Sequence, residues 1–307
     1  MKWLAAVVAV LAVLLFAGGP EASDSRNIQA IWNLGHVPLF AGLALLGCAA
    51  PFARHHSPLW LFIACTVLAL VLGVGIEGLQ RLVGRSFDWL DVWRDVLGVY
   101  LGLCLHLASS KSRAWQQRMA LLGMGGLLLL AALQPMGLVL LDLYAMQKGF
   151  PVLANFETSR ELSRWEAERA ERTLTYEQVR QGRQSLRVVY LAGKFPDVTL
   201  REMRGDWMAY QYLHVSVFNT LNIPLMITIK IYDHDHLNRG NHSGDRFDRE
   251  ILMQPGWNDM DIALDDVKNA PADRAMDMDS IAGLSFFLKA TNQPVVIYLD
   301  DIRLTTG

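Results

Sequence analysis

Long apolar runs in the first half of the chain limit what it can fold into. Residues 59–76 and 121–141 contain no formally charged side chain. An α-helix needs about 20 predominantly apolar residues to cross the hydrocarbon core of a bilayer, and uncharged runs of this length are the clearest hydropathy signal for membrane spans. This signal favours membrane helices over very hydrophobic core helices of a soluble protein. We therefore predict an α-helical membrane bundle of four or five transmembrane helices over residues 1–148, built from apolar runs at residues 3–19, 34–53, 59–76, 92–108 and 119–146.

The first apolar run fits two interpretations. Residues 1–22 contain one lysine, an apolar core and small residues, which describes both a cleaved signal peptide and a retained helix. Both interpretations place residues 22–31 outside the cytoplasm. Alternation of the later runs then places residues 54–58 inside and the segment after residue 149 outside. We therefore expect a multi-pass protein of the inner or plasma membrane with an extracytoplasmic C-terminal domain.

Charge and cysteine content say little more about partners. The chain has 28 Lys and Arg residues against 30 Asp and Glu residues, a formal net charge of -2, so we expect no general attraction to nucleic acid. The three cysteines, Cys48, Cys65 and Cys104, all lie in predicted membrane helices. The second half therefore needs no disulfide. The apolar runs of the first half indicate the lipid bilayer as a partner.

Polar residues interrupt the apolar half at one place. Between residues 75 and 102 the chain has four acids and three arginines. Glu77 and Gln80 share a helical face with two glycines, and Asp91 and Asp95 share another with Gly98. Glycines on such a face allow two helix backbones to approach closely. With the histidine that opens the second run, these side chains would meet at the outer membrane boundary as one set, the rim cluster: His36, Glu77, Gln80, Arg85, Asp88, Asp91 and Asp95.

The rim cluster has two interpretations. Ionisable groups near hydrocarbon are costly, which favours a polar ligand site. Alternatively, Arg85 and Asp88, or Arg81 and Glu77, neutralise each other, and Asp88 or Ser86 caps a helix. We favour the structural interpretation for each residue singly and the ligand site for the set.

Three segments resemble the VanZ-like integral membrane proteins: NLGHVPLFAGLALLG, GIEGLQ and GRSFDWLDVWRDVLGVYLG. The resemblance covers about residues 1–110 and marks His36, Glu77, Gln80, Arg85, Asp88, Asp91, Gly98 and Gly102. Asp95 stands where the family usually has Asn, and Asn33 where a lysine is common. The family is named for low-level resistance to the glycopeptide antibiotic teicoplanin, so the resemblance implies a cell-envelope role and no particular reaction.

The second half of the chain has a different pattern. After residue 149, short alternating runs such as SLRVVYL, YLHVSVFN and LMITIKIYD are separated by turn residues, which is typical of strands. Residues 162–179 fit either a helix or an extended segment. We predict an all-β sandwich over residues 149–307. The order NFE, GRQSLRVVY, PGWNDMDIAL and IYLDDIRL resembles galactose-binding-like jelly-roll modules, a class that often recognises carbohydrate.

That resemblance implies two kinds of site. Such modules commonly tie their first strand to their last through a structural Ca²⁺, and Glu157 with Asp300 or Asp301 offers carboxylate oxygens in the corresponding places. No other cofactor is indicated. Rings that stack on sugars would come from Trp207, Tyr210 and Trp257, although most rings at strand spacing belong to a core. The loop at residues 232–248 is rich in His and Asp, but its spacing matches no closed zinc pattern, and whether it binds metal stays open.

These features leave three functions open. The first is a cell-envelope binder that holds a cell-wall or surface glycan, or a lipid-linked envelope polymer, through the rim cluster and the β module. The second is a membrane enzyme, with Glu77 or one of the Asp residues at 88–95 as general base and His36 as its acid or orienting partner. The third is a scaffold without a ligand. No nucleophile elbow, phosphate loop or H-E-x-x-H motif decides among them.

Overall fold

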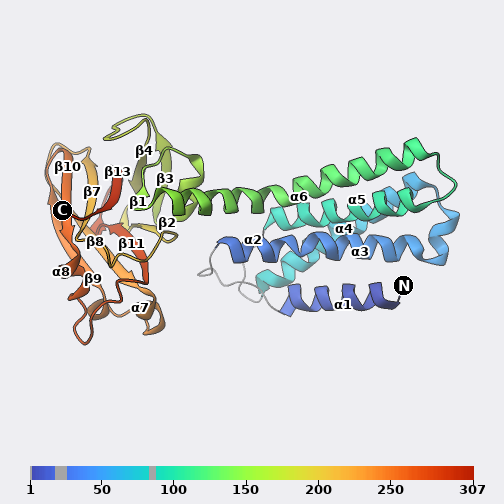
Figure 1. Ribbon diagram of the computed structural model, residues 1–307, viewed down its shortest axis with the longest axis horizontal. Helices are drawn as coiled ribbons and strands as arrows, with labels where there is room; N and C mark the ends of the chain where they lie inside the picture. The colour runs from blue at the N-terminus through green and yellow to red at the C-terminus, as the bar shows by residue number, and fades with distance from the viewer. Residues whose placement is uncertain (1, 18–25, 83–87) are drawn as a thin grey trace. The chain divides into compact units, whose positions relative to one another are not determined.

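The computed structural model describes residues 2–17, 26–82 and 88–307. The chain divides into two compact units, Met1–Leu140 and Leu141–Gly307 (Figure 1). The first unit is helical and the second is a β-sandwich, as expected from the change of pattern near residue 149. The last turns of the final long helix are grouped with the sandwich.

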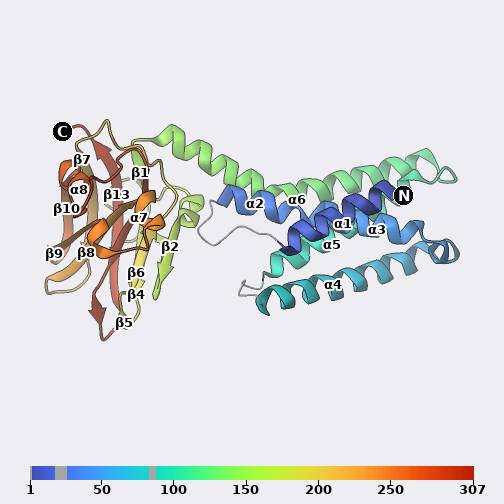
Figure 2. The same ribbon diagram turned by 90° about the horizontal axis from the view of Figure 1, so that it is seen from below.

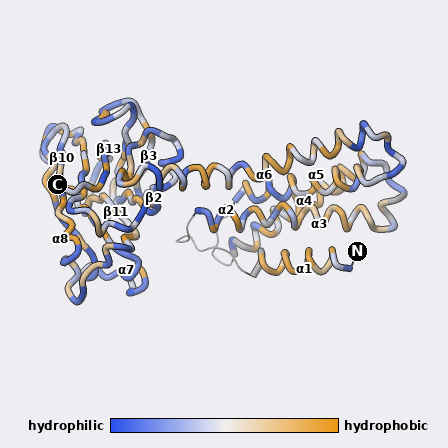
Figure 3. The backbone as a smooth tube through the Cα atoms, viewed as in Figure 1, coloured by the Kyte–Doolittle hydropathy of each residue, from blue (hydrophilic) through white to orange (hydrophobic). Residues whose placement is uncertain are grey.

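The helical unit is built from six α-helices over its described residues. Its elements are α1 (Lys2–Ala17), α2 (Arg26–Leu34), α3 (His36–Ala49), the 3-10 turn η1 (Pro51–His55), α4 (Pro58–Leu82), α5 (Trp89–Ser109) and α6 (Trp115–Gly149). Figure 3 shows mostly apolar residues along these helices. Both long uncharged runs of the sequence are helical, in α4 and α6.

The number of candidate spans is smaller than the four or five predicted. Within the described residues, three helices are long and apolar enough to cross a membrane: Arg26–Ala49, Pro58–Leu79 and Trp115–Gly149. Helix α5 is not among them, because Asp91, Arg94 and Asp95 lie in its first two turns. Helix α1 is apolar over Lys2–Leu14 but shorter.

Helices α3 and α5 form the closest contact of this unit and run side by side in Figures 1 and 2. A Cβ atom added to Gly98 would lie 2.5 Å from the carbonyl oxygen of Val37, and one added to Gly102 would lie 2.5 Å from that of Ala41. The G-x-x-x-G spacing of α5 therefore lets its backbone touch α3. This contact brings the start of α3 next to the start of α5.

The β-sandwich consists of two antiparallel sheets. Its strands are β1 (Val152–Ala154), β2 (Trp165–Glu168), β3 (Ala170–Thr175), β4 (Ser185–Tyr190), β5 (Gly193–Lys194), β6 (Asp197–Leu200), β7 (Tyr212–Asn219), β8 (Leu225–Asp233), β9 (Phe247–Met253), β10 (Gly256–Ala263), β11 (Ile281–Phe287), β12 (Ala290–Thr291) and β13 (Val295–Thr305). Sheet A has the order β10-β7-β13-β4-β3, with β1 paired to β13, and sheet B has the order β2-β6-β11-β8-β9. Strands β5 and β12 form a separate pair.

Short helical turns complete the sandwich. They are η2 (Ser159–Arg164), α7 (His234–Asn238), η3 (Ser243–Asp245) and α8 (Leu264–Lys268). The segment at residues 162–179, whose pattern was ambiguous, contains the end of η2 and then β2 and β3. The all-β prediction for this half is confirmed at the level of a two-sheet sandwich.

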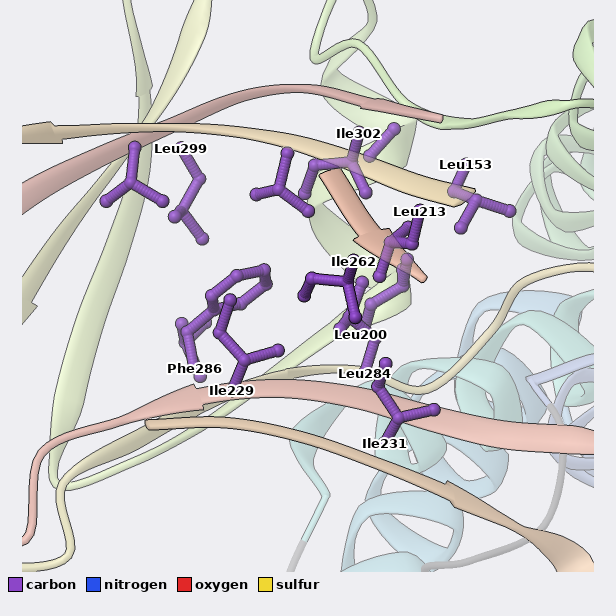
Figure 4. Packing of buried hydrophobic residues seen from close by; sticks show 14 of the residues in the cluster. Leu153, Leu200, Leu213, Ile229, Ile231, Ile262, Leu284, Phe286, Leu299 and Ile302 are labelled. Atoms are coloured by element: carbon purple, nitrogen blue, oxygen red, sulfur yellow. The ribbon is translucent and has the colours of Figure 1, made fainter. Parts of the chain in front are cut away.

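Alternation along the strands builds the core between the sheets. Side chains such as Ile229 and Phe286 of sheet B point toward Leu213 and Ile262 of sheet A (Figure 4). Every second residue of a strand points to the same face, so the residues between them lie on the outer faces. The candidate binding residues of the sandwich therefore lie at the alternate strand positions, whose side chains point away from the core.

Candidate functional site

The described part of the rim cluster is assembled by α3, α4 and α5. The contact between α3 and α5 places the His36 ring beside two carboxylates one turn apart on α5. His36 Nδ1 lies 2.8 Å from Asp95 Oδ1, and Nε2 lies 3.7 Å from Asp91 Oδ2. All three side chains are buried. The predicted convergence of these three residues is therefore present in the structure.

Glu77 brings α4 into the same cluster. Its Oε2 accepts a hydrogen bond of 2.8 Å from the backbone N–H of Asp88, just before α5 begins. Its Oε1 is buried and has no hydrogen-bond partner among the described residues. Four residues earlier on α4, Gly73 leaves room for Asp95, because a Cβ atom at Gly73 would lie 2.6 Å from Asp95 Oδ2.

Arg94 is a member of the cluster that the sequence interpretation did not select. Its Nη1 donates to Asp91 Oδ1 and lies 3.7 Å from Asp88 Oδ2. The spacing of three residues from Asp91 along a helix was the signal that could have identified it. Asp88 also caps α5, because its Oδ1 accepts a 2.8 Å bond from the N–H of Leu90. Arg85 and the side chain of Gln80 lie outside the described residues, so the predicted pair of Arg85 with Asp88 stays a prediction.

The charges of the cluster do not balance among its described members. Among the described residues, Glu77, Asp91 and Asp95 are buried carboxylates, Arg94 is the guanidinium that contacts Asp91, and His36 is cationic only when protonated. A buried charge without a partner is strongly unfavourable. The arrangement is suited to hold a proton or to receive a cationic or hydroxyl-rich group, and a His–Asp pair of this geometry can transfer protons.

In the sandwich, the outer face of sheet A carries an aromatic row. The register places Trp257 opposite Phe218 and Phe218 opposite Tyr298, on three neighbouring strands. The rings of Trp257 and Phe218 meet edge to face at 5.4 Å between centroids, and those of Phe218 and Tyr298 at 6.0 Å. Trp257 lies on the edge strand β10 and is partly exposed.

Fixed polar groups lie beside this row. Two residues after Trp257 on β10, Asp259 accepts a 2.7 Å hydrogen bond from Ser216. Asp259 is also paired with Arg180. The guanidinium carbon of Arg180 lies 6.0 Å from the centre of the Trp257 ring. Burial raises the pKa of Asp259, but the hydrogen bonds from Arg180 and Ser216 outweigh it and lower the pKa below its ordinary value. Asp259 is therefore ionised at neutral pH. One step further, His214 Nδ1 lies 2.8 Å from Asp261 Oδ1.

The other two aromatic candidates differ from Trp257. Trp207 is fully buried in the core, and its indole N–H donates to the carbonyl oxygen of Arg204, so no sugar can stack on its ring in this fold. Tyr210 is partly buried and packs edge to face against Phe150. Of the three predicted rings, Trp257 alone lies in the aromatic row of sheet A.

The carboxylates predicted to hold calcium have backbone partners. Glu157 Oε1 accepts hydrogen bonds from the N–H groups of Arg183 and Gln184, at 2.6 and 3.2 Å. Asp300 Oδ2 accepts from the N–H groups of Arg180 and Gln181, at 2.7 and 2.9 Å. Both residues thus hold the loop between β3 and β4.

N–H donors and a cation would compete for these carboxylate oxygens, so the calcium site stays a prediction. Asp301, the alternative ligand, is paired with Arg303. Gly182 has a positive φ of 76° and leaves the space that Glu157 occupies. Among the described residues, no group of three or more His, Cys, Asp or Glu side chains is arranged to hold a metal ion. The connection between the two ends of the sandwich is made by hydrogen bonds to this loop.

The His- and Asp-rich loop is organised by an arginine that is distant in sequence. Arg274 donates to both oxygens of Asp233 and of Asp245. Hydrogen bonds from Arg274 lower the pKa of Asp245. Asp233 also caps α7 by accepting from the N–H of His236. The carboxylates of Asp233 and Asp245 therefore stabilise the conformation of this loop.

The outer face of sheet B has a different character. Its central ring, Tyr232, is buried beneath the cationic side chains of Arg201 and Lys230, at 5.7 and 5.3 Å from the ring centre. Arg201 also pairs with Glu166, and Lys230 lies 3.8 Å from Asp197. Burial lowers the pKa of Lys230. The outer face of sheet B therefore consists of paired charged side chains, and two of them cover the Tyr232 ring.

Comparison with known proteins finds solved structures that are similar to the C-terminal β region. No family model matches the chain, and no curated protein matches it. A family 11 carbohydrate-binding module from Clostridium thermocellum, solved with a β-1,3-1,4-mixed-linked tetrasaccharide, is 16% identical, with 51% of this chain and 95% of that chain covered and a TM-score of 0.40. An exo-β-agarase is 13% identical, with 51% and 25% covered and a TM-score of 0.42.

A family 30 carbohydrate-binding module of a cellulosomal cellulase of Clostridium thermocellum is 15% identical, with 47% of this chain and 92% of that chain covered and a TM-score of 0.35. Such low values transfer neither ligands nor residue roles. The resemblance to VanZ-like proteins likewise rests on the three quoted segments alone. The function has to be argued from the residues of this chain.

Proposed function

We propose that this is a membrane-anchored glycan-binding protein of the cell envelope, and that the outer face of sheet A is its carbohydrate surface. The observation that carries the proposal is the row of Trp257, Phe218 and Tyr298 beside the fixed carboxylate of Asp259. Carbohydrate presents apolar C–H faces and many hydroxyl groups. An aromatic row next to preorganised hydrogen-bonding groups complements both.

The two faces of the sandwich support the choice of sheet A. Tyr232 on sheet B is 3% exposed and covered by cations, whereas Trp257 is partly exposed at the edge of sheet A. Tyr176, in the loop between β3 and β4 of sheet A, is 78% exposed, and Tyr212 on β7 is 37% exposed. Exposed rings that a sugar can reach therefore lie beside the aromatic row on the side of sheet A.

Binding of defined oligosaccharides by the full-length protein in detergent tests this proposal. A glycan array identifies the ligand, and titration calorimetry measures its affinity. Trp257→Ala should weaken binding by about tenfold or more, because stacking on one aromatic ring is worth about 1–3 kcal/mol. Phe195→Ala, which removes a ring that is 58% exposed elsewhere on the sandwich, should leave affinity unchanged. Equal affinities of Trp257→Ala and the unaltered protein would reject this surface, and selective loss in Arg201→Ala would move the site to sheet B.

The helical unit supplies the anchor in this proposal. Three helices have the length and apolarity for spanning, and the predicted topology exports the sandwich. A reporter enzyme that works only outside the cytoplasm, fused after Gly307, should be active. Activity of a cytoplasm-only reporter at the same position would reject an exported glycan-binding domain.

The rim cluster is a second candidate site, for a lipid-linked or surface polymer. Among the described residues, buried carboxylates outnumber cations at Glu77, Asp91 and Asp95, which favours this site. Glu77→Gln and Asp91→Asn keep size and most hydrogen bonding, so both variants should fold and reach the membrane but fail to restore the envelope phenotype of a deletion strain. Accumulation of a lipid-linked precursor in that strain would favour the alternative of a membrane enzyme. Full complementation by both variants would show that the rim charges serve the architecture alone.

A further inference from the structure

A cavity of about 200 Å³ with both polar and apolar lining lies in the helical unit between α2, α5 and α6. Figure 2 shows α2 next to α6. The cavity is adjacent to the rim cluster through Arg94 but is lined mainly by residues that neither the rim cluster nor the glycan surface uses. These are Arg26, Gln29, Ala30, Asn33 and Leu34 of α2, Arg94 of α5, and Ala132, Pro135, Met136 and Val139 of α6.

The cavity has a polar wall and an apolar wall. Arg26, Gln29 and Asn33 follow each other at spacings of three and four, so one face of α2 supplies a guanidinium and two amides. On the other side, the four lining residues of α6 lie at positions i, i+3, i+4 and i+7, one helical face, and carry no charge. The two walls differ in chemistry as a lipid headgroup differs from its acyl chain.

We propose that this cavity binds the phosphate of an anionic phospholipid, with an acyl chain along the apolar wall of α6. Two guanidinium groups, Arg26 and Arg94, lie around one cavity, and the planar donors of arginine match phosphate oxygens in pairs. A soluble phosphate would leave the α6 wall in contact with water. A lipid covers that wall and places its phosphate between the arginines.

Arg94 can serve both the rim cluster and a phosphate. Its contacts with Asp91 and Asp88 are made through Nη1. A guanidinium has five N–H donors, so it has further capacity for a phosphate oxygen. The proposed lipid site therefore adjoins the rim cluster and does not depend on glycan binding at sheet A.

The test uses delipidated full-length protein in a neutral detergent. Native mass spectrometry measures the binding of short-chain phosphatidylglycerol, of phosphatidylcholine with the same chains, and of inorganic phosphate. We expect phosphatidylglycerol to bind more tightly than both, and Arg26→Gln to weaken it by about tenfold or more, the value of one hydrogen-bonded charge contact. Arg113→Gln, in the turn between α5 and α6 and outside the cavity, is the control of the same residue type and should bind normally.

Three results would overturn the proposal. Equal affinity for phosphatidylglycerol and for zwitterionic phosphatidylcholine would show that the net negative charge of the lipid is not recognised. Equal losses in Arg26→Gln and Arg113→Gln would show non-specific attraction to the protein's positive charge. Inorganic phosphate binding as tightly as the lipid would indicate a soluble-anion site. Melting temperature without lipid checks that Arg26→Gln is folded, and its unchanged glycan affinity would separate this result from the fate of the sheet A proposal.

Discussion

Buried charged side chains have different partners in the two units of this protein. In the sandwich unit, Arg164 makes a two-pronged ion pair with Asp142, at 2.9 and 2.7 Å, and both side chains are buried. Arg274 likewise satisfies two carboxylates at once. In the rim cluster, among the described residues, the buried carboxylates of Asp91 and Asp95 contact His36, and Asp91 also contacts Arg94. The third buried carboxylate, of Glu77, accepts a hydrogen bond from the backbone N–H of Asp88. Matched charges of this kind stabilise a conformation, whereas an unmatched set retains capacity for a ligand or a proton.

The largest expected effect comes from breaking a matched pair. Arg164→Met should lower the free energy of unfolding by about 3–5 kcal/mol, because the buried carboxylate of Asp142 loses its two-pronged ion pair. Unfolding of the β signal in circular dichroism, with the full-length protein in detergent, measures this. Lys289→Met, which breaks an exposed pair with Glu250, should cost less than about 1 kcal/mol. Similar losses in the two variants would remove the distinction between buried and exposed pairs.

A smaller effect is expected at the helix contact that assembles the rim cluster. Gly98→Leu places a side chain against the backbone of α3 and should destabilise the helical unit by about 1–3 kcal/mol or more. Gly126→Leu is a matched control, because a Cβ atom there has no neighbour within 4 Å. The amount of monodisperse protein after detergent extraction, as a function of temperature, reports the difference. Normal behaviour of Gly98→Leu would show that α3 and α5 do not need this close approach.

Acid should weaken the Arg274 network. The pKa of Asp245 is lowered by its hydrogen bonds to Arg274, so its stabilising contribution is complete above the unfolded pKa of about 4 and is lost as the pH falls through the folded value. The melting temperature of the sandwich should therefore begin to fall below about pH 5 and should continue to fall as the pH drops below about 4, through the lowered folded pKa of Asp245. The fall should be shallower in Arg274→Met, which has already lost the contact. Parallel curves for the two proteins would exclude this network as the source of the acid sensitivity.

The smallest effect is expected from calcium. Glu157 and Asp300 already accept backbone hydrogen bonds, so millimolar Ca²⁺ and a chelator should give the same melting temperature. A clear rise in Ca²⁺ would show that these carboxylates exchange their N–H partners for a cation, as the resemblance to jelly-roll modules implied.

Local pattern alone was enough for much of the fold. Apolar runs predict helices because backbone groups in hydrocarbon must be satisfied within the segment, and alternation predicts strands because neighbouring side chains point to opposite faces. The alternation in LMITIKIYD even identifies Lys230 as an outward residue, as the structure has it. The convergence of His36, Asp91 and Asp95 was predictable because helical spacing and the order of the runs determine it.

Tertiary structure decided what these patterns could not. The inward position of Trp207 depends on packing, since an aromatic ring suits a core as well as a sugar surface. Arg274 joins Asp233 across 41 residues, a distance at which spacing carries no information. Glu157 and Asp300 have the carboxylates of a calcium site, and only the fold of the β3–β4 loop shows that N–H groups meet them. The sequence determines which chemical group each side chain carries. The partner of that group depends on which distant backbone segment the fold brings next to it.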